Sequence, residues 1–354
     1  MDTLGKIRGG LIGSAIGDAM GGPVEMWAPH RISETHGWVD SLLPYTMPPN
    51  PTYVWEPDAI PGSYTDDTRL KLLAVRLILE EASDLTPISL ASRFVACHAN
   101  AKDGSLEKEW YSEWAAVGRS FIKNGGTGYD YPGLHGFYGG EMVCGGLITL
   151  PAVGFVFEGN EEAAYDLAYR LAFFDLGYAR DATALATVFV ARAMRDGASV
   201  DSVLSGADYD PYNLSGRQIF GRVCGRYIER AIDVAKQAKT RQELIADMHE
   251  QLIRSTPCDP AEMLAFTVAI LKWVDGDPKA AIPLAVNAGR DNDSIAGVVG
   301  MIAGTLHGID ALPMDWIGTV LKANPEPDIE DMASQLVEVV VKHAGNRCDR
   351  VPNS

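Results

Sequence analysis

Two carboxylates and a hydroxyl stand close together in the stretch 289–297, Gly-Arg-Asp-Asn-Asp-Ser-Ile-Ala-Gly. Asp291, Asp293 and Ser294 bear these groups, and an apolar run follows at 298–306. The pattern predicts a helix start, where ionised carboxylates gain from exposed N–H groups and from the positive end of the helix dipole. Capping explains one such acid, so the second one is surplus to the needs of a helix.

A second acidic cluster lies far upstream, where Thr65, Asp66 and Asp67 open another apolar helix. One helix start does not need two adjacent carboxylates, which repel each other. The two clusters together offer hard oxygen ligands of the kind that Mg²⁺ and Mn²⁺ prefer, whereas zinc sites draw on Cys or His. Each cluster alone is also explained by capping. If the two meet in space, a site for two metal ions is favoured, because four unpaired acids together are costly.

Three separated segments resemble the ADP-ribosylglycohydrolase family. They are Gly-Asp-Ala-Met-Gly-Gly-Pro-Val-Glu at 17–25, Thr-Asp-Asp-Thr at 65–68, and Asp-Asn-Asp-Ser-Ile-Ala at 291–296. They occur in the order of that family, and the resemblance extends over residues 5–310. It implies an all-α, single-domain orthogonal helical bundle and hydrolysis of a glycosidic bond at the anomeric carbon of a ribose. An ADP-ribosyl conjugate and a small N-riboside are both candidate substrates.

The resemblance also implies roles for individual residues. The expected ligands of two Mg²⁺ or Mn²⁺ ions are Thr65, Asp66, Asp67, Asp291, Asp293 and Ser294. Glu25 matches the glutamate near the scissile bond, and we expect it to be catalytic together with Asp66 and Asp293. We expect Asp18 to hydrogen-bond to backbone near the site.

Glycine-rich segments in the middle of the chain are candidates for substrate contact. The passage 124–140 ends in Tyr138, Gly139 and a further glycine, and it either cradles a ribose or phosphate or forms an irregular connection with buried rings. Gly145 and Gly146 belong to a segment that is similar to the central signature of the family. We name all four residues as substrate-binding candidates.

This chain departs from the family pattern at its centre. Cys144 stands where the family usually has Asn, and Thr149 stands where it has Arg. A Thr-His pair has no clear counterpart, since Phe174 and Asp175 lie near its position. These departures spare the acidic clusters and favour a small-molecule or unusual substrate over the ordinary one.

Composition narrows the classes of partner. The chain of 354 residues has a formal net charge of −17, which argues against nucleic acid and anionic membranes as partners. Its five Cys form no CxxC pair, as is typical of a reducing compartment. There is no N-terminal targeting pattern and no apolar stretch of membrane-span length. We therefore expect a cytoplasmic protein that binds a ribose-containing small molecule or an ADP-ribosylated protein, with its oligomeric state open.

Helical patterns must position these groups. We predict helices over 3–20, 86–101, 107–121, 161–176, 181–196, 215–238, 241–254, 260–274, 278–288, 313–323 and 328–343. The glycines in the first of these lower its stability by about 1 kcal/mol each, and such glycines usually permit close helix approach. Start signals include Asp181 and the Asp-Pro pairs at 259–260 and 277–278. The proline-rich segment 44–61 is an ordered surface loop or a lid over the metals.

Two other functions compete with glycoside hydrolysis. A metal-dependent phosphoesterase shares two-metal chemistry, but such sites often use His ligands and no His lies near either acidic cluster. A non-catalytic member of the same fold is the third reading, and the retention of all four clustered carboxylates argues against it.

Overall fold

The computed structural model describes residues 2–45, 59–82, 85–127, 131–205, 209–211 and 222–348. These residues form α-helices, short 3₁₀ helices and connections, with no strand among them, which confirms the predicted all-α class. The buried apolar side chains of the described ranges form a cluster that extends from Ile7 to Val340. This continuity supports the expectation of a single domain.

The helices of the first half of the chain are α1 (Thr3–Gly21), α2 (Pro29–His36), α3 (Asp66–Glu81), α4 (Pro87–Asn100), α5 (Leu106–Lys123), α6 (Pro132–Gly136), α7 (Gly145–Thr149) and α8 (Glu161–Leu171). Those of the second half are α9 (Ala179–Ala193), α10 (Val200–Leu204), α11 (Val223–Gln237), α12 (Arg241–Gln251), α13 (Pro260–Trp273), α14 (Pro278–Asn287), α15 (Asn292–His307), α16 (Met314–Ala323) and α17 (Ile329–Cys348). The 3₁₀ helices are η1 (Gly22–Val24), η3 (Phe137–Gly140), η4 (Pro151–Phe157) and η5 (Ile309–Ala311).

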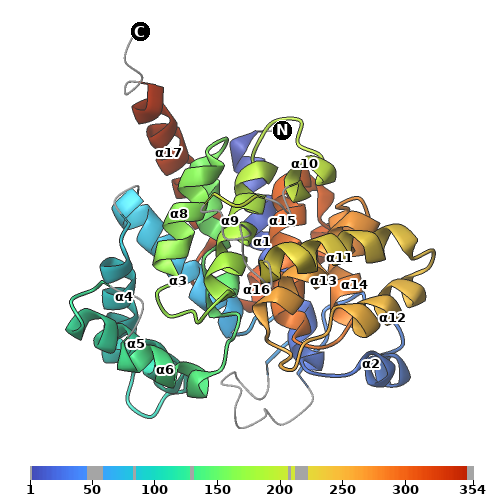
Figure 1. Ribbon diagram of the computed structural model, residues 1–354, viewed down its shortest axis with the longest axis horizontal. Helices are drawn as coiled ribbons and strands as arrows, with labels where there is room; N and C mark the ends of the chain where they lie inside the picture. Colours follow the sequence, from blue (N-terminus) through green and yellow to red (C-terminus); the bar gives the residue numbers. More distant parts are fainter. Residues whose placement is uncertain are drawn as a thin grey trace.

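The centre of the molecule is the antiparallel pair α1 and α15, whose backbones touch (Figure 1). A Cβ atom added to Gly13 would lie 2.5 Å from the carbonyl oxygen of Gly300, and one added to Gly17 would lie 2.0 Å from that of Ala296. One turn further along, a Cβ on Gly21 would lie 2.4 Å from Cα of Asp293. The glycine row therefore fixes the register of the two helices, and the end of α1 arrives at the start of α15.

Two groups of helices lie on opposite sides of this pair (Figure 1). Helices α4, α5 and α6 gather on one side, and α11, α12, α13 and α14 gather on the other. Helix α3 packs against α7, α17 and η4, and it also contacts α1 and α15. The start of α3 thereby lies against the central pair, where the end of α1 meets the start of α15.

Several predicted helix boundaries are confirmed by their caps. Thr86 caps α4 with Pro87 in its first turn, and the side chains of Asp259 and Asp277 accept from the first amides of α13 and α14. None of the described helices combines the length and apolarity that a membrane span requires.

Other predicted boundaries are wrong. The helix predicted from Asp181 begins at Ala179, and Asp181 does not cap it because its buried carboxylate pairs with Arg222. The helix predicted over 161–176 ends at Leu171, since Phe173 and Phe174 leave the helical path to pack in the aromatic core. Short helices α2, α6, α7 and α10 were not predicted, and residues 212–221, with the predicted start near 215, lie outside the described residues.

Most of the proline-rich segment, 46–58, also lies outside the described residues. Its two ends meet, because the amide of Tyr45 donates to the carbonyl oxygen of Ala59 at 3.2 Å. The Tyr45 hydroxyl donates to the carbonyl oxygen of Ser63 at 3.3 Å, two residues before Thr65. The lid role stays a prediction.

Candidate metal centre and active site

The two acidic helix starts converge in the structure. The Thr65 hydroxyl, at the start of α3, lies 3.4 Å from Asp293 Oδ2, at the start of α15. The half-buried Glu25 joins them from the turn after η1, and carboxylate oxygens of Glu25, Asp291 and Asp293 all lie within 4.8 Å of one another. The sequence analysis required the two acidic clusters to meet in space for a shared site, and the structure meets this condition.

Asp18 is the buried connector between α1 and α3. Its Oδ1 accepts from the Thr65 amide at 2.9 Å, and its Oδ2 accepts from the Thr68 amide at 2.9 Å and from the Thr68 hydroxyl. These bonds satisfy exposed amides at the start of α3 and hold it against α1. The predicted structural role of Asp18 is confirmed.

Carboxylate oxygens at this point lack protein partners. Glu25 Oε2, Asp67 Oδ2 and Asp293 Oδ1 are buried and accept no hydrogen bond within the described part of the chain. Burial, and then repulsion from neighbouring carboxylates, raises the pKa of all three groups well above the usual range. Burial followed by the Asp18 charge raises the pKa of Asp66 to about 6.

This donor set fits hard divalent cations. Its atoms are carboxylate and hydroxyl oxygens, the ligands of Mg²⁺ and Mn²⁺. A cation would also satisfy the orphaned oxygens of Asp67 and Asp293 and offset the repulsion that raises the pKa values of these acids. Thr65, Asp291 and Asp293 lie at this position, and ligation by them and by Asp66, Asp67 and Ser294 stays a prediction.

One buried cation that the sequence analysis missed lies under the acids. Lys71 is 2 % exposed and donates to Ser14 Oγ at 2.5 Å. Asp67, Asp18 and Asp293 are the negative charges that favour its protonated form, although burial lowers its pKa. The sequence feature that could have identified Lys71 is its position four residues after Asp67, because residues four apart share one face of a helix.

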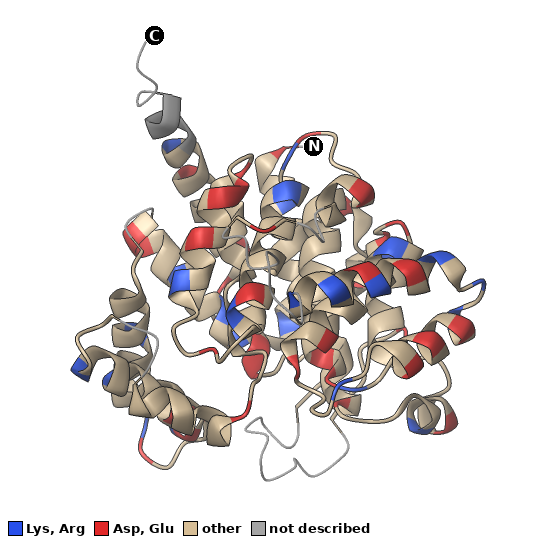
Figure 2. Ribbon diagram, viewed as in Figure 1, with Lys and Arg blue, Asp and Glu red and all other residues tan. Residues whose placement is uncertain are grey.

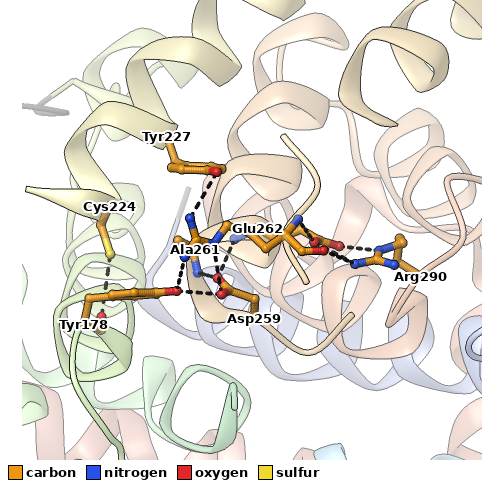
Figure 3. Close-up of polar contacts among 8 residues, drawn as sticks. Tyr178, Cys224, Tyr227, Asp259, Ala261, Glu262 and Arg290 are labelled. Atoms are coloured by element: carbon orange, nitrogen blue, oxygen red, sulfur yellow. Dashed lines mark hydrogen bonds and ion pairs between the residues drawn. The ribbon is translucent and has the colours of Figure 1, made fainter. Parts of the chain in front are cut away.

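A buried ion-pair network fixes the residue before Asp291 (Figure 3). Arg290 Nε donates to Glu262 Oε1 at 2.5 Å, and Arg290 Nη2 donates to Glu262 Oε2 at 2.9 Å. Glu262 is fully buried and also accepts from the Arg254 amide at 2.6 Å. Because this pair is bidentate, it holds the Gly289–Asp291 turn in one place.

A cavity of about 430 Å³ opens beside the carboxylates and is lined by both Asp66 and Tyr138. The Tyr138 ring packs edge-on against Trp114 with 6.4 Å between centroids, and 40 % of the residue is exposed. Tyr138 and Gly139 both have positive φ, at 45° and 68°. The predicted substrate-binding role of Tyr138 and Gly139 stays a prediction, and the shared cavity supports it.

Gly145 and Gly146 are buried where α7 begins. The Gly146 amide donates to Asp175 Oδ1 at 3.0 Å, and a Cβ on Gly146 would lie 2.2 Å from Asp175 Oδ2. A Cβ on Gly145 would meet the Trp114 ring at 3.2 Å. Packing inside the protein therefore explains both glycines, and their predicted contact with substrate stays a prediction.

Two thiols adjoin the Asp291 side of the site. Cys144 Sγ lies 3.5 Å from Asp291 Oδ2, and both residues influence the pKa of Cys258. Cys258 was not anticipated, because nothing in its sequence surroundings links it to the acidic clusters.

Comparison with known proteins decides the family. Residues 1–345 match the family described as ADP-ribosylglycohydrolase. The chain belongs to the ADP-ribosylglycohydrolase family. The match covers both acidic clusters and Glu25, so the resemblance of three short segments extends to the whole helical bundle.

Two further similarities agree with this membership. The chain is 23% identical over 318 residues to "Uncharacterized protein YegU" of Escherichia coli (strain K12), and the alignment covers 87% of this chain and 89% of that protein. A solved structure titled "ADP-ribosylglycohydrolase-related protein complex" superimposes with a TM-score of 0.66 at 20% identity, and it covers 96% of this chain and 99% of that chain. The structural match shows the ADP-ribosylglycohydrolase fold, and the family is one of glycosyl hydrolase-like enzymes.

Proposed function

We propose that this protein is a metal-dependent hydrolase that cleaves the glycosidic bond at the anomeric carbon of a ribose. The substrate is an ADP-ribosyl conjugate or a small N-riboside. The observation that carries the proposal is the convergence of Glu25, Asp291 and Asp293, with carboxylate oxygens within 4.8 Å of one another.

Two divalent cations, Mg²⁺ or Mn²⁺, are the proposed cofactors. Their ligands are Thr65, Asp66 and Asp67 from the start of α3, with Asp291, Asp293 and Ser294 from the start of α15. Cations held by these ligands would fix the vicinal hydroxyls of the ribose and would neutralise the charge that develops in the transition state.

Glu25 is the proposed acid–base residue. Burial, followed by the nearby acids, raises its pKa, which favours the protonated form that can pass a proton to the leaving group. The same carboxylate then accepts a proton from the attacking water. Asp66 and Asp293, also proposed as catalytic, would be held ionised by the bound cations despite their raised pKa values, and so would keep negative charge next to the anomeric carbon as an oxocarbenium-like state develops.

The cavity lined by Asp66 and Tyr138 is the proposed site that orients the sugar. Tyr138 stands on its wall together with Asp66, so a ribose at Asp66 places its substituent along the Tyr138 ring. The partly exposed ring offers a face for stacking a planar group. The Trp114 contact holds that ring in position.

A hydrolysis screen with Mg²⁺ or Mn²⁺ tests the proposal. The substrates are ADP-ribosyl-arginine, ADP-ribosyl-serine, O-acetyl-ADP-ribose and simple nucleosides. We expect a product with a free anomeric hydroxyl, and release of inorganic phosphate alone would instead indicate a phosphoesterase. Glu25→Gln should lower kcat by about 10²–10⁴ and leave Mn²⁺ binding intact, whereas Glu34→Gln on the exposed face of α2 should change neither.

A further inference from the structure

Tyr45 places its hydroxyl group between two segments that lead into the proposed active site. The hydroxyl donates to the carbonyl oxygen of Ser63 at 3.3 Å. A Cβ atom added to Gly22 would lie 2.0 Å from the same hydroxyl oxygen, so the hydroxyl fills the space that a side chain at position 22 would need. The absence of a side chain at Gly22 is therefore what admits the hydroxyl against the backbone.

Each of the two contacted segments leads to a proposed site residue. Gly22 opens η1, and the Glu25 amide donates to the Gly22 carbonyl oxygen at 3.3 Å. Ser63 stands two residues before Thr65, a proposed metal ligand. The Cβ atom added to Gly22 would also lie 2.9 Å from Thr65 Cγ2, so the two segments meet where Tyr45 contacts them. The position of the Tyr45 hydroxyl therefore bears on the separation of Glu25 and Thr65.

Both segments have further anchors. The η1 segment continues directly from α1, which packs closely against α15. In the other segment, Asn324 Nδ2 donates to the Gly62 carbonyl oxygen at 2.8 Å, and Asn324 Oδ1 accepts from the Tyr64 amide at 3.4 Å. Because each segment has an anchor of its own, loss of the Tyr45 hydroxyl should alter the gap between them without unfolding either one.

The Tyr45 hydroxyl stays protonated beside the acids. Burial raises its pKa well above the usual range, and the charges of Asp18 and Asp293 are the next largest causes. Acidic residues are spread over many helices of this chain of net charge −17 (Figure 2), which adds to the cost of a phenolate. A protonated hydroxyl donates a hydrogen bond and carries no charge. Tyr45 therefore joins the two segments without adding to the repulsion among the carboxylates.

We propose that Tyr45 is a positioning residue of the active site, which sets the separation between the turn that carries Glu25 and the segment that carries Thr65. Its hydroxyl acts through the backbone at Gly22 and Ser63. The effect of Tyr45 on hydrolysis rests on the proposed function, whereas its effect on Mn²⁺ affinity is measured without any ribosyl substrate.

The first experiment removes the hydroxyl group and keeps the ring, in Tyr45→Phe. Mn²⁺ is titrated calorimetrically into the full-length protein after its metal has been removed with EDTA. We expect the affinity to fall about 5-fold, within the range for loss of one hydrogen bond. Tyr131→Phe is the matched control, because the Tyr131 hydroxyl also donates to a backbone carbonyl oxygen, that of Phe173, at 3.0 Å. This control should lower the midpoint of urea unfolding and leave Mn²⁺ affinity unchanged.

The second experiment reaches the same contact from the other side. The methyl group of Gly22→Ala would start 2.0 Å from the Tyr45 hydroxyl oxygen and 2.9 Å from Tyr45 Cζ, so the closest clash is with the atom that Tyr45→Phe removes. We expect Mn²⁺ affinity to fall about 10-fold in Gly22→Ala. The double variant should bind Mn²⁺ more tightly than Gly22→Ala alone, since the effects of contacting residues do not add. A double variant weaker than either single variant contradicts positioning through Gly22.

The third experiment is kinetic and uses saturating Mn²⁺. In Tyr45→Phe, kcat for a hydrolysed ribosyl compound should fall about 10-fold while KM stays unchanged, because the Glu25 turn shifts and the substrate contacts remain. Unchanged Mn²⁺ affinity in Tyr45→Phe, or an equal loss in Tyr131→Phe, overturns the inference. Absence of hydrolysis by a wild type that binds Mn²⁺ contradicts the proposed function, and the Mn²⁺ titrations still decide the role of Tyr45. No Mn²⁺ binding by the wild type overturns both.

Discussion

The amide nitrogen of Met26 donates a hydrogen bond to the carbonyl oxygen of Arg290 across 2.9 Å. Met26 directly follows Glu25, and Arg290 directly precedes Asp291. Both residues have positive φ, 62° and 67°, a conformation that is uncommon outside glycine. Strain of this kind persists only where the surroundings enforce it, and it clusters at functional sites. The two strained residues therefore join the proposed acid–base residue to a proposed metal ligand.

Loss of the ion pair between Arg290 and Glu262 should weaken the backbone connection between Met26 and Arg290. Glu262→Gln removes the charge from a fully buried partner of Arg290, and loss of one member of a buried pair typically costs about 3–5 kcal/mol. We expect a lower midpoint in urea unfolding and weaker Mn²⁺ binding. Asp166→Asn removes one side of an exposed pair with Arg170, whose loss is worth at most about 0.5 kcal/mol. Equal effects of the two variants would contradict the anchoring role.

Gly17→Ala should separate α1 from α15. The new methyl group would start 2.0 Å from the carbonyl oxygen of Ala296, a backbone atom that cannot turn aside. We expect destabilisation by about 1–3 kcal/mol together with loss of Mn²⁺ affinity, because the register of the two helices sets the position of the site. Gly318→Ala in α16 meets nothing within 4 Å and should be neutral or stabilising. Thermal unfolding with and without Mn²⁺ measures both effects.

Lys71→Met should make the protein more dependent on metal. The substitution removes a buried cation that interacts with Asp67, Asp18 and Asp293, so repulsion among the acids grows in the metal-free state. The metal-free melting temperature should fall, and the increase on saturation with Mn²⁺ should exceed that of the wild type. Lys322→Met, at an exposed position of α16, should leave the increment unchanged. An identical increment in Lys71→Met would show that Lys71 does not balance the site.

Asp175 should make stability depend on pH. Burial raises the pKa of Asp175 to about 7, while the unfolded chain keeps the ordinary value of 3.8. The folded state therefore binds the extra proton between these values, so its contribution to stability is full below about pH 4 and is lost as the pH rises toward about 7. Asp175→Asn should be less pH-dependent in this window and should gain stability relative to wild type as the pH rises. Urea unfolding at several pH values with EDTA present measures the difference, and parallel curves would contradict the shift.

Much of the site could be predicted from sequence because its residues sit in short local patterns. Asp67 and Asp293 are surplus acids at helix starts, and this surplus indicated a shared site before any contact was known. The glycines of α1 indicated close packing, although their pairing with the Gly300 region of α15 depends on the tertiary register.

Other features could not be predicted because tertiary contacts create them. Cys258 reaches Asp291 only because the segment before α13 packs beside α15. Helix α8 ends at Leu171 because the packing of Phe173 and Phe174 overrides helix propensity. Asp175 therefore lies outside the helix, where it accepts a hydrogen bond from the Gly146 amide. Asp181 looked like a cap until its pairing with Arg222 was visible.

Metal stoichiometry tests the central claim most directly. Mn²⁺ binding to the EDTA-treated, full-length protein should be followed by electron paramagnetic resonance, with Asp67→Asn and Asp293→Asn as variants from the two helix starts. We predict two bound ions in the wild type with a signal broadened by their mutual coupling, and loss of this coupling in each variant. Binding of no Mn²⁺, or full retention of the coupled pair in either variant, would contradict the claim that the starts of α3 and α15 together hold the metals.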